Sequence, residues 1–487
     1  MSADERILLG CRRVVLPGDN GLMTAPAAVE VDPETGLIDA VYPLPEGAAY
    51  RDALTELADE LGAQVDDLGD GVLTPAFVDV HTHLGLVVLR GTGVEEASAG
   101  DVVEDLFYRF EHLLTAEDVD CFVRMGAYEA LMSGTGLVWD HYFYGETVAK
   151  ALSDVGLTAV VAPTLEDVFG PQTGQVEAQI EATLALASGS APPGIFAAFG
   201  PHATDTVSLG LWERVAELSE THQLPFHAHL AQSLGEVERT RAREGCTPVE
   251  LLERAGVLER APAALLVHDL YVTRAELERI AASQAYVQMG FCPRSQRIFA
   301  FPADPGLWDA AGLDWSIGTD CPASNDAASM AREITALAGI RGHQTSGSEA
   351  YRAFVEGGDP EAVWTGRQAD HAQIARQVAP SELLSRAWSV PGDLHPQVQA
   401  GVIAPGALAN VVLWDMDHPA MWPSESPLRA LAYSAPTAAI TQVMTRGQWR
   451  GTRGDFARSL IDTEEYRAVL AEATARRSVL LHKSGLR

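Results

Sequence analysis

Two histidines one residue apart end an apolar stretch near the start of the chain and could bind one metal ion together. His81 and His83 follow residues 77–80, Phe-Val-Asp-Val, a run that predicts a buried strand. Side chains two residues apart leave the same face of a strand, so both imidazoles can reach one ion. A second such pair, His227 and His229, occurs further along. The first pair is therefore a weak signal when taken alone.

Further short apolar runs that end in His or Asp strengthen this signal. They end at His202, His229, His268 and Asp320, in that order. If the runs are parallel strands of a (β/α)8 barrel, their carboxyl ends meet at one mouth, so His81 and Asp320 can lie at the same ion. Nitrogen ligands with one carboxylate suit Zn or Fe, with a water in the open coordination position. The spacing therefore predicts a metal site with hydrolytic chemistry.

The pattern of apolar and polar residues along the chain predicts the strands and helices that could position these residues. Short apolar strands alternate with helical stretches between about 72 and 398, and the helical stretches cover 116–132, 145–155, 175–187, 209–221 and 274–282. Repeated β-then-α units of this size favour a parallel sheet, and a closed (β/α)8 barrel is the best candidate. Short strands split by turn residues occur at both chain ends, and we expect them to form one small β-sandwich.

The expected fold is therefore α/β, a (β/α)8 TIM barrel with a small β-sandwich domain built from both chain ends. Its expected segments are the N-terminal part of the sandwich (1–70), the catalytic metal-binding barrel (71–398), the C-terminal part of the sandwich (399–455) and a C-terminal helix (456–487).

Composition narrows the class of partner. The net charge is −33, which disfavours nucleic acid and anionic membrane, because phosphate binding needs a cationic face. The chain has no apolar run long enough to span a membrane and no signal-peptide pattern at its start. Five scattered cysteines indicate neither a disulfide framework nor a zinc knuckle. We expect a cytoplasmic protein with a small-molecule substrate, and a homo-oligomer, dimer or higher.

Several motifs together resemble the amidohydrolase superfamily, in particular its triazine hydrolases and its guanine and cytosine deaminase-like enzymes. The resemblance covers nearly the whole chain. It is carried by Pro75-Ala76-Phe77-Val78-Asp79-Val80-His81-Thr82-His83, Gly200-Pro201-His202-Ala203, His227-Ala228-His229-Leu230-Ala231, Cys292-Pro293-Arg294-Ser295, Gly318-Thr319-Asp320-Cys321-Pro322-Ala323-Ser324-Asn325 and Gly401-Val402-Ile403-Ala404-Pro405-Gly406.

The resemblance implies a role for each histidine at a strand end. It implies His268 as the residue that polarises the substrate carbonyl or tetrahedral oxygen, and His202 as a substrate contact. It implies that His227 points away from the metal, because the match places its neighbour as a ligand. The metal ligands that it implies are His81, His83, His229 and Asp320.

The two lysines of the chain bear on the number of metal ions. Two-metal members of the superfamily bridge their ions with a carboxylated lysine at a barrel strand end. The only lysines here are Lys150, in an apparent helix, and Lys483, near the end of the chain. The sequence therefore predicts one divalent metal ion, Zn or Fe.

The chain departs from the deaminase pattern at Gln232. Deaminases of the group carry a glutamate three residues after the metal histidine, to move a proton from the activated water to a ring nitrogen. Glutamine has no titratable proton in the working pH range. Either Asp320 and His268 handle the proton without it, which the metal makes feasible by lowering the water's pKa toward roughly 7, or the protein is not a catalyst. We expect the first, with Gln232 as a neutral contact to the substrate.

Three functions remain open. Ring protonation matters less for a polar carbonyl, so the favoured one is hydrolysis of a C–N bond in a urea, carbamate or amide-type molecule, including aryl xenobiotics. The alternative is a deaminase or dechlorinase of an N-heteroaromatic ring, such as a purine, pyrimidine or triazine. The third is a catalytically inactive scaffold.

Aromatic residues follow two of the early motifs. They are Phe107, Tyr108, Phe110, Trp139, Tyr142, Phe143 and Tyr144. Loops at these places would line the barrel mouth and suit a neutral, partly aromatic ligand, with Tyr142 as a substrate contact. Ordinary core packing would explain the same residues equally well.

Overall fold

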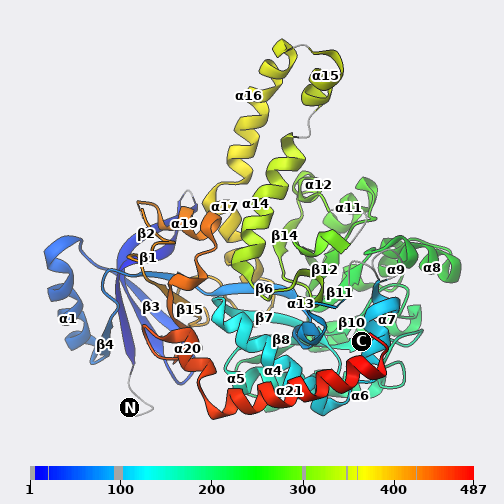
Figure 1. The fold of residues 1–487 in the computed structure, drawn as a ribbon, viewed down its shortest axis with the longest axis horizontal. Coiled ribbons are helices and arrows are strands. Elements are labelled where there is room, and N and C mark those ends of the chain that lie inside the picture. The colour runs from blue at the N-terminus through cyan, green and yellow to red at the C-terminus, as the bar shows by residue number, and fades with distance from the viewer. Residues whose placement is uncertain are drawn as a thin grey trace.

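The computed structural model describes residues 6–19, 21–92, 102–298, 303–346, 349–358, 360–423 and 425–486. Figure 1 shows a barrel with a β-sheet on one side, drawn in blue and orange, and a helical arm that projects from the top of the view. The long C-terminal helix α21 (Glu464–Lys483) crosses the barrel at the bottom of the view.

Parallel strands close into a ring. One sheet has the order β10-β8-β7-β6 with β9 beside β8, and a second has the order β11-β12-β13-β14. Bridges between Phe199 and Phe226 and between Thr82 and Asp320 join the two sheets at both edges. The ring confirms the predicted (β/α)8 barrel, with β9 and β10 sharing one position. Its strands are β6 (Phe77–Thr82), β7 (Thr135–Tyr142), β8 (Thr158–Leu165), β9 (Ile195–Ala197), β10 (Gly200–Pro201), β11 (Phe226–Leu230), β12 (Ala263–His268), β13 (Tyr286–Phe291) and β14 (Asp314–Ile317).

Helices cover the outside of the ring, so most barrel strands are buried on both faces and read as continuous apolar runs. The predicted helical stretches are confirmed with end shifts of at most two residues at α4, α5, α6, α7 and α11. The outer helices are α4 (Ala116–Met132), α5 (Gly145–Val155), α6 (Val176–Ala185), α7 (Leu209–His222), α8 (Leu234–Glu244), α9 (Pro248–Arg254), α10 (Val257–Arg260), α11 (Arg274–Ala281) and α12 (Pro305–Ala311). The short helix α13 (Pro322–Asn325) follows Asp320 and is fully buried.

Strands from both ends of the chain share one sheet beside the barrel. Its order is β17-β16-β15-β5-β1-β2-β3, and β4 pairs with the first residues of β1, Ile7 to Gly10. The C-terminal strands therefore rejoin the N-terminal module as expected, and inward side chains from both chain ends form one apolar core. The strands are β1 (Ile7–Gly18), β2 (Gly21–Asp32), β3 (Leu37–Pro43), β4 (Gln64–Asp67), β5 (Val72–Pro75), β15 (Val411–Trp414), β16 (Ile440–Thr445) and β17 (Gln448–Arg450).

A helix that the sequence analysis did not predict lies within the N-terminal module. Helix α1 (Tyr50–Leu61) buries Tyr50, Leu54 and Ala58 against one face of the sheet and ends at Gly62, which has a φ of 63°. This four-residue spacing, followed by a C-terminal glycine, is a helix signal that the strand-rich surroundings obscured.

A helical arm leaves the barrel after β14 (Figure 1). It consists of α14 (Met330–Ser346), α15 (Glu349–Gly357) and α16 (Pro360–Gln377), inside the range predicted as barrel. Val355 and Trp364 are largely exposed on it. The chain then returns through short helices to the sheet. These are α17 (Pro380–Ser385) and α18 (Ser389–Gly392). Helix α19 (Pro427–Ser434) lies between β15 and β16, and α20 (Phe456–Ile461) lies between β17 and α21.

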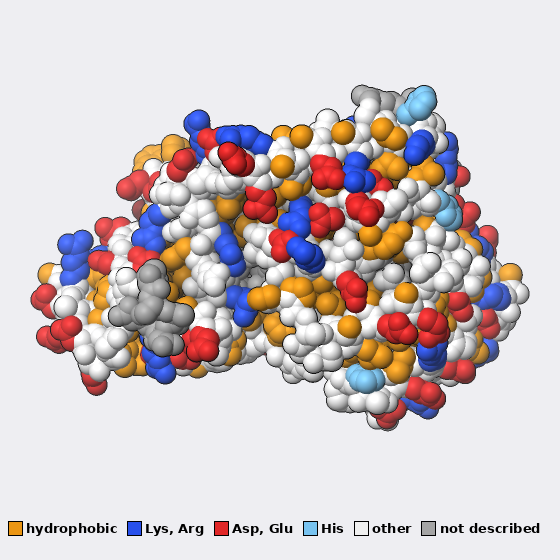
Figure 2. Space-filling model, turned by 90° about the horizontal axis from the view of Figure 1, so that it is seen from below, with side chains coloured by type: hydrophobic (Ala, Val, Ile, Leu, Met, Phe, Trp, Pro, Cys, Tyr) orange, Lys and Arg blue, Asp and Glu red, His pale blue; other side chains and the backbone are white. Residues whose placement is uncertain are grey.

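Acidic and basic side chains are interspersed on the face shown in Figure 2, with no broad field of one sign there. Among the described residues, no helix is long and apolar enough to cross a membrane.

Candidate metal centre and active site

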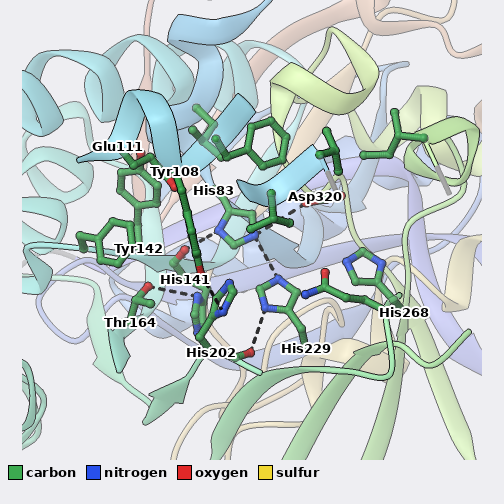
Figure 3. Close-up of a pocket in the computed structure, with 17 residues that line it drawn as sticks. His83, Tyr108, Glu111, His141, Tyr142, Thr164, His202, His229, His268 and Asp320 are labelled. Carbon is green, nitrogen blue, oxygen red and sulfur yellow. Dashed lines mark hydrogen bonds and ion pairs between the residues drawn. The ribbon is translucent and has the colours of Figure 1, made fainter. Parts of the chain in front are cut away.

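The carboxyl ends of four barrel strands bring histidines and one aspartate to a common point. His83 follows β6, His229 lies on β11, His268 ends β12 and Asp320 comes three residues after β14. Figure 3 shows these four side chains turned toward one another at the barrel mouth. Together with His81, they form two overlapping groups of metal-ligand atoms, each within 4.8 Å: His81, His83, His229, and His81, His268, Asp320.

Hydrogen bonds to the far side of two rings aim their other nitrogens at this point. The Nδ1 of His83 bonds the backbone carbonyl of His141, and the Nδ1 of His229 bonds the carbonyl of His202 at 3.0 Å. Because a carbonyl only accepts, both Nδ1 atoms carry the proton, and each Nε2 keeps its lone pair. The two Nε2 atoms lie 3.3 Å apart.

His81 has the same orientation with a different partner. Its Nδ1 lies 2.7 Å from the Nε2 of His227, and its own Nε2 is buried without a hydrogen-bond partner among the described residues. A buried ring nitrogen is rarely left unpaired, so an unpaired Nε2 that faces other ligand atoms suits a metal bond. His227 thus stands behind His81 rather than at the common point.

The distances at the common point match the dimensions of one small cation. The Oδ1 of Asp320 lies 3.6 Å from the Nε2 of His81 and 3.7 Å from the Nε2 of His83. Ligands about 2.0–2.1 Å from a tetrahedral zinc lie about 3.3 Å from each other. The residues present therefore fit one divalent metal ion.

The protonation states of these groups also suit a metal. Burial lowers the pKa of His81 to about 3, and it lowers the pKa values of His83 and His229 as well. For Asp320, burial acts to raise the pKa, but the interaction with His81 and the charges of the neighbouring histidines outweigh it and lower the pKa. Neutral imidazoles and an ionised carboxylate are the forms that bind metal.

Asp320 is held in place by the backbone at the barrel seam, where the bridge between Thr82 and Asp320 closes the ring. Its φ of 58° lies in the left-handed region, and its backbone N–H donates to the carbonyl of His81 at 2.7 Å. Two residues earlier, a Cβ on Gly318 would lie 2.8 Å from the backbone of His81, so only glycine permits this approach. The buried Asp79 accepts two bonds from Thr319, at 2.9 and 2.6 Å, and braces the same seam.

Comparison with known proteins identifies the family of the chain. The profile of the amidohydrolase family matches residues 72–353, more than half of the chain. This chain belongs to the amidohydrolase family. The match confirms the predicted recognition and enzyme class, a hydrolase of carbon–nitrogen bonds other than peptide bonds.

Relatives of this amidohydrolase include nucleoside deaminases. It is 28% identical over 413 residues to the 5-methylthioadenosine/S-adenosylhomocysteine deaminase of Moorella thermoacetica, covering 85% of this chain and 88% of the relative. Its fold is similar to a zinc-bound adenosine deaminase from Xanthomonas campestris (TM-score 0.75, 23% identity, 98% of each chain). It is also similar to the zinc complex of atrazine chlorohydrolase from Arthrobacter aurescens (TM-score 0.74, 19% identity, 97% and 100% of the chains).

No lysine of this amidohydrolase lies near the metal ligands. Lys150 is exposed on the outer helix α5 and pairs with Asp154, while Lys483 ends helix α21. A bridging carboxylated lysine is therefore impossible, which supports the expectation of one metal ion.

The loop after β11 brings Gln232 to the pocket. Ala231 adopts a φ of 48°, and the buried carboxylate of Glu236 accepts the backbone N–H groups of Ala231 and Gln232 at 3.0 and 2.8 Å. Gln232 lines the same pocket as His229 and His268. The loop is thus held rigidly, and an amide stands where the related deaminases are expected to carry a carboxylate.

The opposite wall of the pocket is largely aromatic (Figure 3). His202 donates to or accepts from Thr206 at 2.9 Å and Tyr108 at 3.4 Å. The aromatic residues that line the pocket are Phe107, Tyr108, Tyr142 and Phe143, whereas Phe110 and Trp139 belong to the core. The open space between these side chains is about 50 Å³.

Sequence reasoning missed three polar residues of this wall, His141, Thr164 and Glu111. Thr164 and His141 bond each other at 3.2 Å. Glu111 directly follows the aromatic stretch 107–110 and is buried. An acidic residue directly after a largely aromatic run was the available signal. Burial raises the pKa of Glu111 to about 8, and it raises the pKa of Tyr142 well above its usual value, with Glu111 as the second cause.

Replacing Glu111 by Gln should remove a pH dependence of stability. Glu111 keeps its proton in the folded protein up to about pH 8 but loses it near 4.5 when unfolded. Stability should therefore fall as pH rises from 4.5 to 8, by up to about 1.4 kcal/mol per pH unit. Urea unfolding at pH 5.5 and 7.5 should show a smaller difference for Glu111→Gln than for the wild type. An unchanged difference would show that Glu111 is ionised in the folded protein.

Proposed function

We propose that this amidohydrolase holds one divalent ion, Zn or Fe, with His81, His83, His229 and Asp320. The support is geometric, since three Nε2 atoms and one carboxylate oxygen face a common point at the barrel mouth. A divalent metal at that point would supply a water of lowered pKa as the nucleophile for C–N hydrolysis.

We further propose that the reaction is deamination of an aminated N-heteroaromatic ring, with the adenine ring of a nucleoside as the first substrate class to test. The observation that carries this proposal is the match to nucleoside deaminases over 85% of the chain. The aromatic wall opposite the metal ligands, formed by Phe107, Tyr108, Tyr142 and Phe143, suits a flat ring. This reverses the preference of the sequence analysis for a urea or carbamate.

The chain's own residues divide the work of the reaction. Asp320, ionised and close to His81, accepts the proton of the attacking water. His268 lies on the same side, with its ring 5.6 Å from that of His229 and nearly parallel to it, and stabilises the oxygen that gains negative charge. His202, oriented by Thr206, contacts the substrate from the other wall.

One observation favours carbonyl hydrolysis as a second candidate. Gln232 can donate and accept hydrogen bonds but cannot carry a proton to a ring nitrogen. A urea or carbamate does not lose aromaticity on attack and so has less need of that proton. The second candidate therefore rests on Gln232 alone.

A substrate panel separates the two candidates. Metal-loaded protein should release ammonia from methylthioadenosine, adenosine, guanine or an aminotriazine and should leave phenylureas and carbamates intact. Turnover of a urea or carbamate without turnover of any ring would overturn the deaminase proposal. Inactivity toward every compound at full metal content would favour the scaffold alternative.

Replacing His268 by Ala should lower turnover by roughly 10²–10³-fold, the usual cost of removing one oxyanion-stabilising donor. Bound metal should stay near the wild-type level, because all four proposed ligands remain. His268 also lies within one ligand group with His81 and Asp320. Metal analysis of the purified variant decides between the roles, since metal loss would make His268 a ligand.

A further inference from the structure

Two arginines lie at the opposite end of the barrel from the metal ligands. A hollow of about 240 Å³ opens where β8 and β9 begin, whereas the metal ligands stand where the strands end. Residues that line it include Ser153, Gly156, Gly194, Arg446, Gln448 and Arg450. Neither arginine has a role in the reaction proposed above.

Arg446 occupies a backbone position that arginine does not favour. It forms the two-residue turn between β16 and β17 with Gly447, and both residues have positive φ, 48° and 71°. Such type I′ turns prefer Asn, Asp or Gly at the first position, because these residues adopt the left-handed backbone at a lower energetic cost than residues with longer side chains. An arginine at a backbone position that disfavours it indicates that its side chain serves another purpose.

Arg450 is held in a fixed orientation. Its Nε donates to the Oγ1 of Thr445 at 2.7 Å, and that hydroxyl donates to the carbonyl of Gly156 at 2.6 Å. The rest of the guanidinium group lies against the backbone of Gly156, where an added Cβ would be 2.6 Å from the Cζ of Arg450. The stem of Arg446 likewise lies over Gly194, where a Cβ would be 2.8 Å from its Cδ. Two glycines thus make room for the two arginines.

No carboxylate neutralises either guanidinium group within the described ranges of the chain. Asp154, beside Ser153 of the hollow, is engaged by Arg124 and Lys150 instead. Burial and the charge of Arg446 both lower the pKa of Arg450, which is the effect of two nearby cations without an acid. Such an arrangement is unexpected in a chain with a net charge of −33, where acids are abundant.

We propose that this hollow binds a phosphate group between Arg446 and Arg450. Guanidinium groups match phosphate oxygens with paired hydrogen bonds, and two of them balance the nearly two negative charges of phosphate at neutral pH. The ligand is inorganic phosphate or a small phosphomonoester. Because the hollow is at the far end of the barrel, this ligand is distinct from the substrate.

Calorimetry on the full-length, metal-loaded protein tests the proposal at constant ionic strength. Titration with inorganic phosphate should show saturable binding of about one phosphate per chain, and ribose 5-phosphate in a parallel titration distinguishes the phosphomonoester source. Arg450→Gln should weaken binding roughly tenfold or more, the usual effect of losing a charged hydrogen-bond partner. Arg274→Gln, at an exposed arginine on α11 away from the hollow, should bind phosphate like the wild type.

Arg446→Asn gives a test that does not depend on loss of folding. Asn suits the turn better than Arg, so the variant should unfold at the same or a higher temperature without phosphate. It should nevertheless lose the phosphate-dependent rise in unfolding temperature that the wild type shows. The absence of saturable phosphate binding in the wild type, or equal stabilisation of the wild type and both hollow variants, would overturn the proposal.

Discussion

His229→Ala should lose its bound metal and, with it, at least about 10³-fold in turnover, because the activated water contributes several kcal/mol to the reaction. The Nε2 of His229 is one of three that face the common point, and its Nδ1 is fixed by the carbonyl of His202. Metal content by elemental analysis and turnover on the best ring substrate measure the two effects. His222→Ala, an exposed histidine at the end of α7, is the matched control and should keep both.

His227 provides the contrast that tests the choice between the two neighbouring histidines. Its Nε2 lies 2.7 Å from the Nδ1 of His81, so we propose that it supports a ligand without being one. His227→Ala should weaken metal binding roughly 10–100-fold, as is typical for the outer partner of a ligating histidine, and excess metal should restore activity. Full metal content in His229→Ala together with irreversible metal loss in His227→Ala would show that the two roles are reversed.

Gln232→Glu should raise the deamination of a ring substrate by roughly 10²–10⁴-fold if proton transfer limits the reaction. The loop that carries residue 232 is already held by Glu236, so the new carboxylate replaces the amide on an unchanged backbone. Steady-state turnover of adenosine or methylthioadenosine, with a phenylurea measured in parallel, reports the effect. Gln284→Glu, at an exposed position before β13, makes the same chemical change away from the site.

The result also separates the two candidate functions. If the natural substrate is a urea or carbamate, a second carboxylate beside Asp320 adds negative charge near the attacking water, and native activity should fall. A gain on ring substrates without such a loss supports the deaminase proposal. Equal activity of wild type and Gln232→Glu on every ring substrate would contradict the idea that a proton carrier is missing.

The main features of the fold could be predicted because periodicity is a local property and because the barrel topology fixes where its strands end. Helices such as α4 and α5 have their expected bounds, and parallel strands of a barrel must end at one mouth, which brings His81 and Asp320 together across 239 positions. The backbone bridge between Thr82 and Asp320, which closes the ring, lies at this same mouth.

Other features depend on tertiary contacts that no local pattern contains. The bond between His81 and His227 requires the relative position of two strands, and the burial of Glu111 requires the wall that covers it. The choice between core and pocket for Tyr142 and Trp139 likewise depends on which way each side chain faces on β7. Within the helical arm, α14 and α16 have weak amphipathic patterning, so periodicity did not reveal these two helices.

The shared sheet has a consequence for how the protein is made. Strand β5, which leads into the barrel, pairs with β15, and Val411 lies opposite Pro75, 336 residues earlier in the chain. On the ribosome, the strands of the first chain end must therefore wait with an open edge until almost the whole protein has emerged. Completion of this sheet is a late, long-range event of the kind that slows folding, and chaperones that shield strand edges would find their target in β5.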